Sequence, residues 1–429
     1  MLSKKEAAWV GGGMLASIVA MLVGTRLLTQ LLPTAEYGRV ALAMTIATFV
    51  VQGLATPVSL MTMRFFAPMR ARGELRYLLS DSYRINGGVL VVTAALALVG
   101  VAGAPFIRIV TFLPAEIVLI GTLSILLAII RAALGLEDAA QERPLRAILQ
   151  GGHDVTRFAL AVVTLLALGR GTAEAVLYGF CAAAALSVLG HVVLMRPRLD
   201  AIARAELGAR QTPTRVLTQF MWPLFASNIA LWFVMMSERW VLAWTGSLSE
   251  VGGYAAIYQI AFLPMTLISG FLLVLSMPIL YRRIGTAADE AAVSQALRPN
   301  LVFAGIVFIV TLGGFALGLV GHELICGWLL GPEYRGYSWI FPWLLLAGGC
   351  FATAQQLLLK LTSTYRTAVL AYLWMFLAAL ACLTYAVFAA FWKLPGLVWG
   401  VVLINVSLLV LAAVLTGTGP GVLKQAPEQ

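Results

Sequence analysis

Residues 9–66 read WVGGGMLASIVAMLVGTRLLTQLLPTAEYGRVALAMTIATFVVQGLATPVSLMTMRFF. This stretch predicts an apolar helix that carries one arginine, Arg26, and breaks at Pro33, followed by a turn and a second long apolar helix. A related stretch occupies residues 226–265 and reads ASNIALWFVMMSERWVLAWTGSLSEVGGYAAIYQIAFLPM. When the two are aligned, Arg26 matches Arg239, and Glu36-Tyr37-Gly38 matches Glu250-Val251-Gly252. The chain therefore contains a repeat.

The two matched arginines are the most informative polar residues of the repeat. An isolated arginine inside an apolar helix is costly in lipid, so it is expected to face protein or water. Because Arg26 and Arg239 occupy matching places in the two copies, we expect them to face one shared interior. The alternative for each is that its side chain extends to the membrane interface, since each lies close to a helix end.

The composition indicates a membrane protein. Of the 429 residues, 61% are hydrophobic and 11% are charged, whereas soluble domains carry about 25% charged residues. This excludes a soluble enzyme. The four cysteines and three histidines are scattered along the chain, so we expect neither a disulfide nor a metal site, and no cofactor.

About 20 apolar residues are needed to cross a bilayer. We predict an all-α integral membrane protein of about twelve spans, and the weakest span is the fifth, because its purely apolar part is short. The predicted spans are 8–32, 39–64, 86–106, 115–136, 145–169, 172–195, 217–245, 253–281, 299–320, 337–359, 367–391 and 395–416.

Most of the 29 Lys and Arg residues fall in alternate loops, on the side of both termini. The positive-inside rule then places both termini in the cytoplasm. The net charge of +10 is explained by this topology and does not indicate a nucleic-acid partner. A basic inner face is expected to attract anionic membrane lipids.

The longest predicted cytoplasmic connection, residues 196–216, divides the chain into two parts. The predicted N-terminal lobe is 1–195, with six spans, and the predicted C-terminal lobe is 217–429, also with six. Because six is even, the lobes have the same orientation and are related by an axis along the membrane normal.

Polar residues inside the spans concentrate in the first, second, seventh and eighth, which predicts a water-accessible central cavity between the lobes. Spans 3, 6, 9 and 11 are nearly purely apolar and are expected to face lipid. Pro57 and Pro264 lie at corresponding depths and permit a bend in the second helix of each copy. The candidate substrate-binding residues are Arg26, Gln52, Arg64, Asn228, Arg239, Tyr258, Gln259 and Gln355.

Arginine suits phosphate recognition, because it stays charged and offers a planar fork of donors. Acids are scarcer inside the spans. Glu238 and Asp154 are candidates for ion coupling, since a buried carboxylate is what a proton or sodium relay needs. Each also has an arginine nearby, Arg239 or Arg157, so an internal ion pair is the alternative.

Four stretches of the chain carry a resemblance to a known family. They are TRLLTQLLPTAEYGRVALAMTI (25–46), MRFFAPMRARGEL (63–75), SERWVLAWTGSLSEVGGYAAIYQIA (237–261) and LICGWLLGPEYRGYSWIFPWLLLAG (324–348). Together they resemble the polysaccharide-transporter branch of the MATE/oligosaccharidyl-lipid/polysaccharide (MOP) exporter superfamily, the Wzx-type O-antigen and exopolysaccharide flippases. The similarity runs from about Trp9 to Gly400.

The resemblance implies twelve helices in two pseudo-symmetric, MATE-like lobes that open alternately to either side. It implies an undecaprenyl-diphosphate-linked oligosaccharide as cargo, moved to the outer leaflet for polysaccharide biosynthesis, and a cationic lumen in which Arg26 is the position carried over. It also implies the bacterial cytoplasmic (inner) membrane as the location, and a polysaccharide polymerase and a chain-length regulator as partners. The sodium site of the drug-exporting relatives has no counterpart in the acids of spans 1 and 2.

Three functions follow from these observations. A flippase breaks no covalent bond and needs no catalytic group, so the leading hypothesis is a transporter, not an enzyme. An ion-coupled multidrug or small-molecule exporter of the same fold is the alternative, but its cationic cargo favours acids in the cavity. A membrane glycosyltransferase needs catalytic residues on a sizeable loop, and the largest predicted outer loop, residues 321–336, is short.

Overall fold

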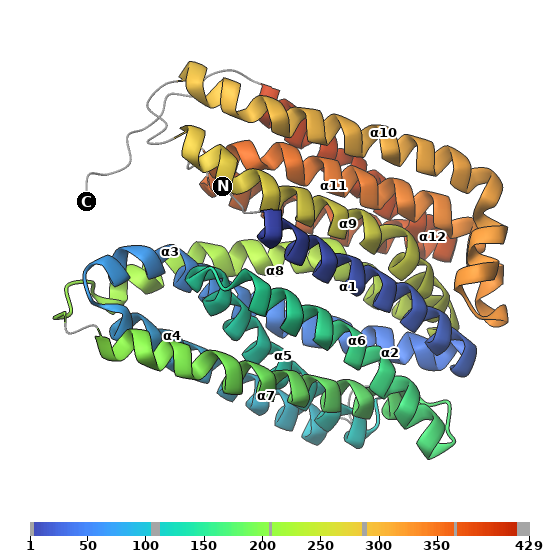
Figure 1. The fold of residues 1–429 in the computed structure, drawn as a ribbon. Coiled ribbons are helices and arrows are strands. Elements are labelled where there is room, and N and C mark those ends of the chain that lie inside the picture. The colour runs from blue at the N-terminus through green and yellow to red at the C-terminus, as the bar shows by residue number, and fades with distance from the viewer. Residues whose placement is uncertain (1–3, 104–111, 206–207, 285–289, 364–366, 418–429) are drawn as a thin grey trace.

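The computed structural model describes residues 4–103, 112–205, 208–284, 290–363 and 367–417 (Figure 1). In these ranges the chain forms helices joined by short turns. The helices are α1 (Lys4–Leu31), α2 (Thr34–Thr48), the π-helix η1 (Phe49–Ala55), α3 (Thr56–Ala71), α4 (Leu75–Gly103), α5 (Pro114–Ala140), α6 (Arg143–Leu168), α7 (Ala173–Ala205), α8 (Thr214–Thr245), α9 (Leu248–Ile284), α10 (Glu290–Leu329), the 3-10 helix η2 (Pro332–Ile340), α11 (Phe341–Ser363) and α12 (Thr367–Gly417).

Within the described residues, 11 helical segments are long and apolar enough to cross a membrane. The last of these, Ala368–Gly417, contains two helices that meet at Lys393, whose backbone has φ 53° and ψ −136°. The described chain therefore has about twelve spans, and the all-α fold class is confirmed. The fifth predicted span is also confirmed, since α6 runs without a break from Arg143 to Leu168.

The helices pack into two groups (Figure 1). Helices α1–α7 pack on one another, and we call them the N-terminal lobe; helices α8–α12 do the same and form the C-terminal lobe. Helix pairs that meet across the boundary include α2 with α9, α1 with α9, and α8 with η1 and α3. Spans 1 and 2 thus contact spans 7 and 8, the four in which the polar residues concentrate.

The molecule has two ends (Figure 1). We call the end that holds both termini and the α3–α4 turn the terminal end. The other end holds the α1–α2, α8–α9 and α10–η2 turns, and we call it the opposite end. By the distribution of basic residues, the terminal end is the one expected in the cytoplasm.

Span 2 changes its helical form at half depth. The π-helix η1 inserts wider turns between α2 and α3, directly before Pro57. Arg131 of α5 donates from Nε to the Thr56 hydroxyl at 3.0 Å, and Phe49 stacks edge-on against Trp232 of α8. In the second copy α9 continues as one helix through Pro264. The two matched prolines therefore lie in different local structures.

Helix α8 packs on both lobes. Near the terminal end, Leu217 and Met221 are buried in an apolar cluster with Met61 and Met69 of the N-terminal lobe. Farther along, α8 packs on α12, where the Tyr385 hydroxyl donates to the Val234 carbonyl at 3.0 Å. The seventh span therefore crosses from one lobe to the other.

The segment before α8 is fixed to the N-terminal lobe by Glu74, which is fully buried in the α3–α4 turn. Its carboxylate accepts from the backbone N–H of Thr212 at 2.9 Å and of Gln211 at 3.2 Å. Burial opposes ionisation, but these hydrogen bonds and the charge of Arg72 outweigh it, so the pKa of Glu74 lies below its ordinary value of 4.5. A second link is the ion pair of Arg210 with Asp81 at 2.5 Å.

This arrangement predicts a pH-dependent attachment of residues 208–214. A carboxyl group whose pKa is lowered by folding stabilises the fold above its ordinary pKa, and this contribution is lost as pH falls through the lowered value. We therefore expect amide protection in residues 210–214, corrected for intrinsic exchange rates, to fall below about pH 4.5. In Glu74→Gln protection is expected to be reduced at neutral pH and to lose this pH dependence. Equal protection in both proteins at all pH values would contradict the role of Glu74.

Candidate functional site

The two lobes touch most closely at the opposite end, through the matched turns of the repeat. A Cβ atom added to Gly38 would overlap the Leu248 carbonyl oxygen, and one added to Gly252 would overlap the Thr34 carbonyl oxygen. Each of these glycines also lies against the backbone nitrogen of the other. The two copies of the repeat therefore face each other across the lobe boundary, and only glycine fits at the contact.

A third turn, between α10 and η2, joins the same contact. Arg26 of α1 donates to the carbonyl oxygen of Leu330, directly after α10, and at 3.4 Å to that of Gly327 in the last turn of α10. The Thr29 hydroxyl accepts from the Gly331 N–H at 2.9 Å, and Tyr334 donates to the Leu32 carbonyl at 2.9 Å. We call these contacts, together with the glycine pair, the lobe seam.

The role of Arg26 in this state follows from its contact with unpaired carbonyl groups at the end of α10. The last turn of a helix carries carbonyl groups with no intrahelical partner and a partial negative charge, which a cation stabilises. Arg26 supplies that cation from the other lobe and is half-buried. The Gln30 amide lies 3.1 Å from Nη2 of Arg26 and accepts from it when its oxygen is turned toward the guanidinium. Arg26 thus holds the lobe seam closed.

Arg239 lies in a different environment, where α8 meets α9 and where Tyr37 of α2 is an electrostatic neighbour from the N-terminal lobe. Its guanidinium carbon is 4.7 Å from the ring centre of Tyr258, and its Nε is 3.6 Å from Oε1 of Glu238. Arg239 is 7% exposed and Glu238 1% exposed. The described contacts do not join Arg239 to Arg26, so the expected shared interior is not seen in this state.

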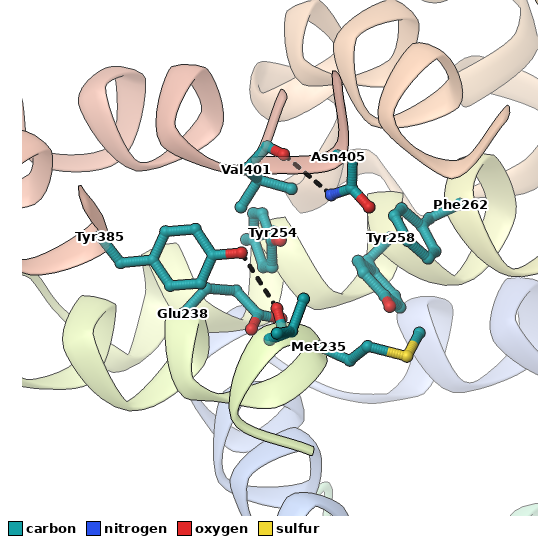
Figure 2. A pocket seen from close by; sticks show the side chains of 9 residues that line it. Met235, Glu238, Tyr254, Tyr258, Phe262, Tyr385, Val401 and Asn405 are labelled. Carbon is teal, nitrogen blue, oxygen red and sulfur yellow. Dashed lines mark hydrogen bonds between the residues drawn. The ribbon is translucent and has the colours of Figure 1, made fainter. Parts of the chain in front are cut away.

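Glu238 belongs to a buried polar cluster (Figure 2). Around it lie Tyr254 and Tyr258 of α9 with Tyr385 and Asn405 of α12, all nearly fully buried. They line a small cavity, about the size that one water molecule needs. We call these five residues the Glu238 cluster.

The Glu238 cluster carries unused hydrogen-bonding capacity. Both carboxylate oxygens of Glu238, both phenolic hydroxyls of Tyr254 and Tyr258, and the amide oxygen of Asn405 lack a hydrogen-bond partner among the described residues. Buried polar atoms are normally paired, so such a concentration indicates a site that binds water or a small ligand or that exchanges a proton. Glu238, one of the two candidate ion-coupling residues, is at its centre.

The pairing of Glu238 with Arg239 predicts a strong and asymmetric effect on stability. Removing one partner of a buried ion pair leaves an uncompensated charge, which costs about 3–5 kcal/mol. We expect Arg239→Met to lower the thermal unfolding temperature of the protein in lipid nanodiscs strongly. The double variant Arg239→Met with Glu238→Gln is expected to recover most of the loss. If the double variant were less stable than Arg239→Met, the ion-pair account would be wrong.

Solved structures show the same arrangement of helices. A multidrug-resistance MATE transporter of the MOP superfamily, in an inward-facing conformation, matches with a TM-score of 0.69 at 12% identity over 96% of both chains. The Vibrio cholerae MATE transporter VcmN matches at 0.67 and 15% identity, also over 96% of both chains. The lipid II flippase MurJ, in an inward closed conformation, matches at 0.66 and 10% identity over 97% of this chain and 88% of its own.

The chain has the fold of the MOP transporters. At these identities the likeness establishes the MOP fold, with its two six-helix lobes, and leaves the branch of the superfamily open. No family model matches the sequence, and no curated protein does.

The remaining candidate residues are spread over the MOP fold. Gln52 lies half-buried in η1, Asn228 donates to the Leu224 carbonyl of its own helix at 2.8 Å, and Gln259 and Gln355 are half-buried. Arg64 of α3 is exposed and makes no hydrogen bond or ion pair with the described residues. It is therefore the candidate arginine whose charge is available in this state.

Asp154, the second candidate for ion coupling, connects helices of the N-terminal lobe. It accepts from the Ser17 hydroxyl of α1 at 2.7 Å and lies 3.7 Å from Arg157 on its own helix. Both interpretations of this residue, ion pair and relay, thus remain open to experiment.

Sequence reasoning missed several of these residues. Tyr385 lies in span 11, which was expected to face lipid; its fully buried phenol is a correction to that prediction. The signal was Tyr385 at mid-span and, in span 12, the lone Asn405, each within a long apolar run. His153 and His191, which are separated in the chain, are electrostatic neighbours between α6 and α7.

Proposed function

We propose that the protein is a flippase that moves an undecaprenyl-diphosphate-linked oligosaccharide from the cytoplasmic to the outer leaflet of the bacterial inner membrane. The cargo would serve the biosynthesis of a surface polysaccharide such as O-antigen or exopolysaccharide. A sugar and diphosphate headgroup cannot cross about 30 Å of hydrocarbon unaided. A protein that carries it need not make or break a covalent bond, so no catalytic residue is assigned.

The observation that carries this proposal is the place of Arg26. It lies on the lobe seam, in a fold that is also that of a lipid II flippase. The guanidinium fork can bind two phosphate oxygens. In this state Arg26 is hydrogen-bonded to carbonyl groups at the end of α10. Its side chain therefore becomes available to a diphosphate only when the seam opens.

The contacts of this state support an alternating-access cycle. The lobe seam closes the opposite end, and the basic loops assign the terminal end to the cytoplasm. We propose that the headgroup first meets Arg64, whose charge is available in this state, and meets Arg26 after the seam opens toward the outer leaflet. The lipid tail remains in the bilayer, and anionic lipids contact the basic loops. A polysaccharide polymerase and a chain-length regulator are the proposed protein partners.

Complementation tests the proposed function. The gene is deleted in its native host, and surface polysaccharide is followed together with the leaflet in which the lipid-linked precursor accumulates. The expected result is loss of polysaccharide with precursor trapped on the cytoplasmic side, and recovery with the wild-type gene. Unchanged polysaccharide in the deletion strain, in the absence of a second copy of the gene, would overturn the proposal.

A drug exporter is the second candidate, and the Glu238 cluster favours it. A buried carboxylate with three aromatic neighbours suits a coupling cation. The two functions separate in one assay, because a drug exporter lowers the accumulation of cationic dyes in whole cells and leaves the lipid-linked precursor unaffected. Dye export with normal polysaccharide would replace the flippase proposal by this one.

A further inference from the structure

A buried acid–base pair lies in the N-terminal lobe, away from the seam and the Glu238 cluster. Nδ1 of His191 on α7 is 2.6 Å from Oε1 of Glu137 on α5. Their side chains are 2% and 0% exposed. The second oxygen of Glu137 and Nε2 of His191 lack a hydrogen-bond partner among the described residues.

The pair has little compensation for its burial. A buried polar group without a hydrogen-bond partner lowers the stability of the fold by about 1–3 kcal/mol. Two such atoms, Oε2 of Glu137 and Nε2 of His191, occur in this one contact. A link that served only to join α5 to α7 would be better made by apolar side chains, since buried ion pairs contribute little net stability. Histidine is the side chain whose ordinary pKa lies nearest to neutral pH, and a carboxylate neighbour favours its charged form.

Other titratable groups lie on either side of the pair and form a row across three helices. On the side of the terminal end, Asp138 follows Glu137 in the chain, is 17% exposed and pairs with Arg146 of α6 at 2.7 Å. On the other side, His153 of α6 is an electrostatic neighbour of His191, and its Nδ1 is also without a partner.

The row continues to α1. Asp154, next to His153, accepts hydrogen bonds from Ser17 of α1 and from Gln150 at 3.2 Å, and lies beside Arg157. Further charged groups near the row are Arg131 of α5 and Arg143 at the start of α6, both of which interact electrostatically with Asp138. Helices α3 and α4 approach this end of α7 through the apolar cluster around Met195. Helix α1 carries Arg26 at its other end, so the row connects to the helix that holds the lobe seam.

We propose that Glu137 and His191 form a proton-binding site of the N-terminal lobe, which exchanges one proton with the terminal end through Asp138. The proton is bound by the pair as a unit and is held on His191 as an imidazolium against the Glu137 carboxylate. Release leaves a neutral imidazole hydrogen-bonded to the carboxylate. In the proposed transport cycle, this proton is the coupling ion; that part of the inference rests on the proposed function.

The first test is a histidine titration of the intact protein. The protein is labelled with ¹⁵N-histidine and placed in lipid nanodiscs. Because the chain has only 3 histidines, few ring signals are expected. The variants His153→Gln and His322→Gln identify which signal belongs to His191. We expect the ring signals of His191 to change from those of an imidazolium to those of a neutral imidazole within the pH range in which the protein stays folded. A wild-type His191 that keeps one protonation state over this range would overturn the proposal without the use of any variant.

A second measurement distinguishes a proton site from a structural contact. Glu137→Gln keeps the shape of the side chain and removes the charge that favours the imidazolium. The pH dependence of the His191 ring signals is expected to differ from that of wild type, because the carboxylate that faces the imidazolium is gone. His322, which contacts Ser338 in the C-terminal lobe, serves as the internal reference. An unchanged pH dependence of the His191 signals would assign the pair a structural role.

The coupling is tested in proteoliposomes that hold a fluorescent undecaprenyl-diphosphate oligosaccharide and a pH gradient. Wild-type protein is expected to flip the lipid severalfold faster with the gradient than without it, and Glu137→Gln is expected to lose this stimulation. Glu323→Gln, at an exposed acid on α10, is the matched control and should respond as wild type. If wild-type protein does not flip the lipid, the proposed function is contradicted, and the titration result for the proton site is unaffected. If it flips the lipid equally fast with and without the gradient, only the proposed proton coupling is overturned.

Discussion

Replacing Gly252 with alanine is expected to prevent closure of the lobe seam and to abolish transport. The new methyl group would overlap the Thr34 carbonyl oxygen, and a backbone atom cannot move aside as a flexible side chain can. Overpacking at rigid contacts costs about 1–3 kcal/mol and sometimes more, which lowers the closed population about tenfold to a hundredfold. Gly38→Ala, on the other lobe, is expected to have the same effect.

Spin labels report this closure directly. They are placed at Arg170, in the turn before α7, and at Glu323, near the end of α10, in a variant without the native cysteines. We expect Gly252→Ala to move the distance distribution to longer values and to fail in complementation at normal protein level. Gly336→Ala is the matched control, because a Cβ there meets no atom within 4 Å. A closed distance distribution in Gly252→Ala would refute the assignment of this contact.

The second large effect is expected at Arg26. Arg26→Ala removes charge-assisted hydrogen bonds to the end of α10, each worth about 1.5–3 kcal/mol, and leaves the Leu330 carbonyl without its donor. The closed population should fall at least about tenfold, and the arginine proposed to meet the diphosphate is lost as well. Surface polysaccharide is therefore expected to fall to the level of the deletion strain.

Arg26→Lys separates the two roles of the arginine. Lysine keeps the charge and can reach a carbonyl, but it lacks the planar fork that binds two oxygens. We expect nearly normal closure in the spin-label measurement and a marked loss of polysaccharide. Arg335→Ala, an exposed arginine that donates to the same Gly327 carbonyl at 3.2 Å, is the control. Full complementation by Arg26→Ala would remove Arg26 from the site and leave the flippase proposal intact.

The fold could be predicted from the sequence because spans leave a local signal. Long apolar windows located every helix, and the alignment of Gly38 with Gly252 anticipated two equivalent turns. Their direct contact, and the third turn that joins them, depend on how the lobes dock. The break of span 2 into a π-helix also has no local signal beyond Pro57, because it depends on Arg131 and Trp232 from other helices.

The site was less predictable, because it depends on the direction in which each side chain points around its helix. Arg26 and Arg239 match in the alignment, yet one meets the end of α10 and the other meets Glu238. The Glu238 cluster draws Tyr385 and Asn405 from spans that are otherwise apolar, and the Glu137–His191 pair joins residues 54 apart in the chain. Contacts between side chains of distant helices depend on how the helices pack, so a single sequence contains no local signal that predicts them.

Helix α8 has a consequence for the origin and folding of the two halves. Its first turns complete the apolar cluster of the N-terminal lobe, while its later turns complete the packing of α12. A fragment that ended before Thr214 would leave the hollow filled by Leu217 and Met221 open to lipid and water. Although the repeat suggests an ancestral duplication, no single cut leaves both halves complete, because the half without α8 would have to assemble with the other before it acquired its native core.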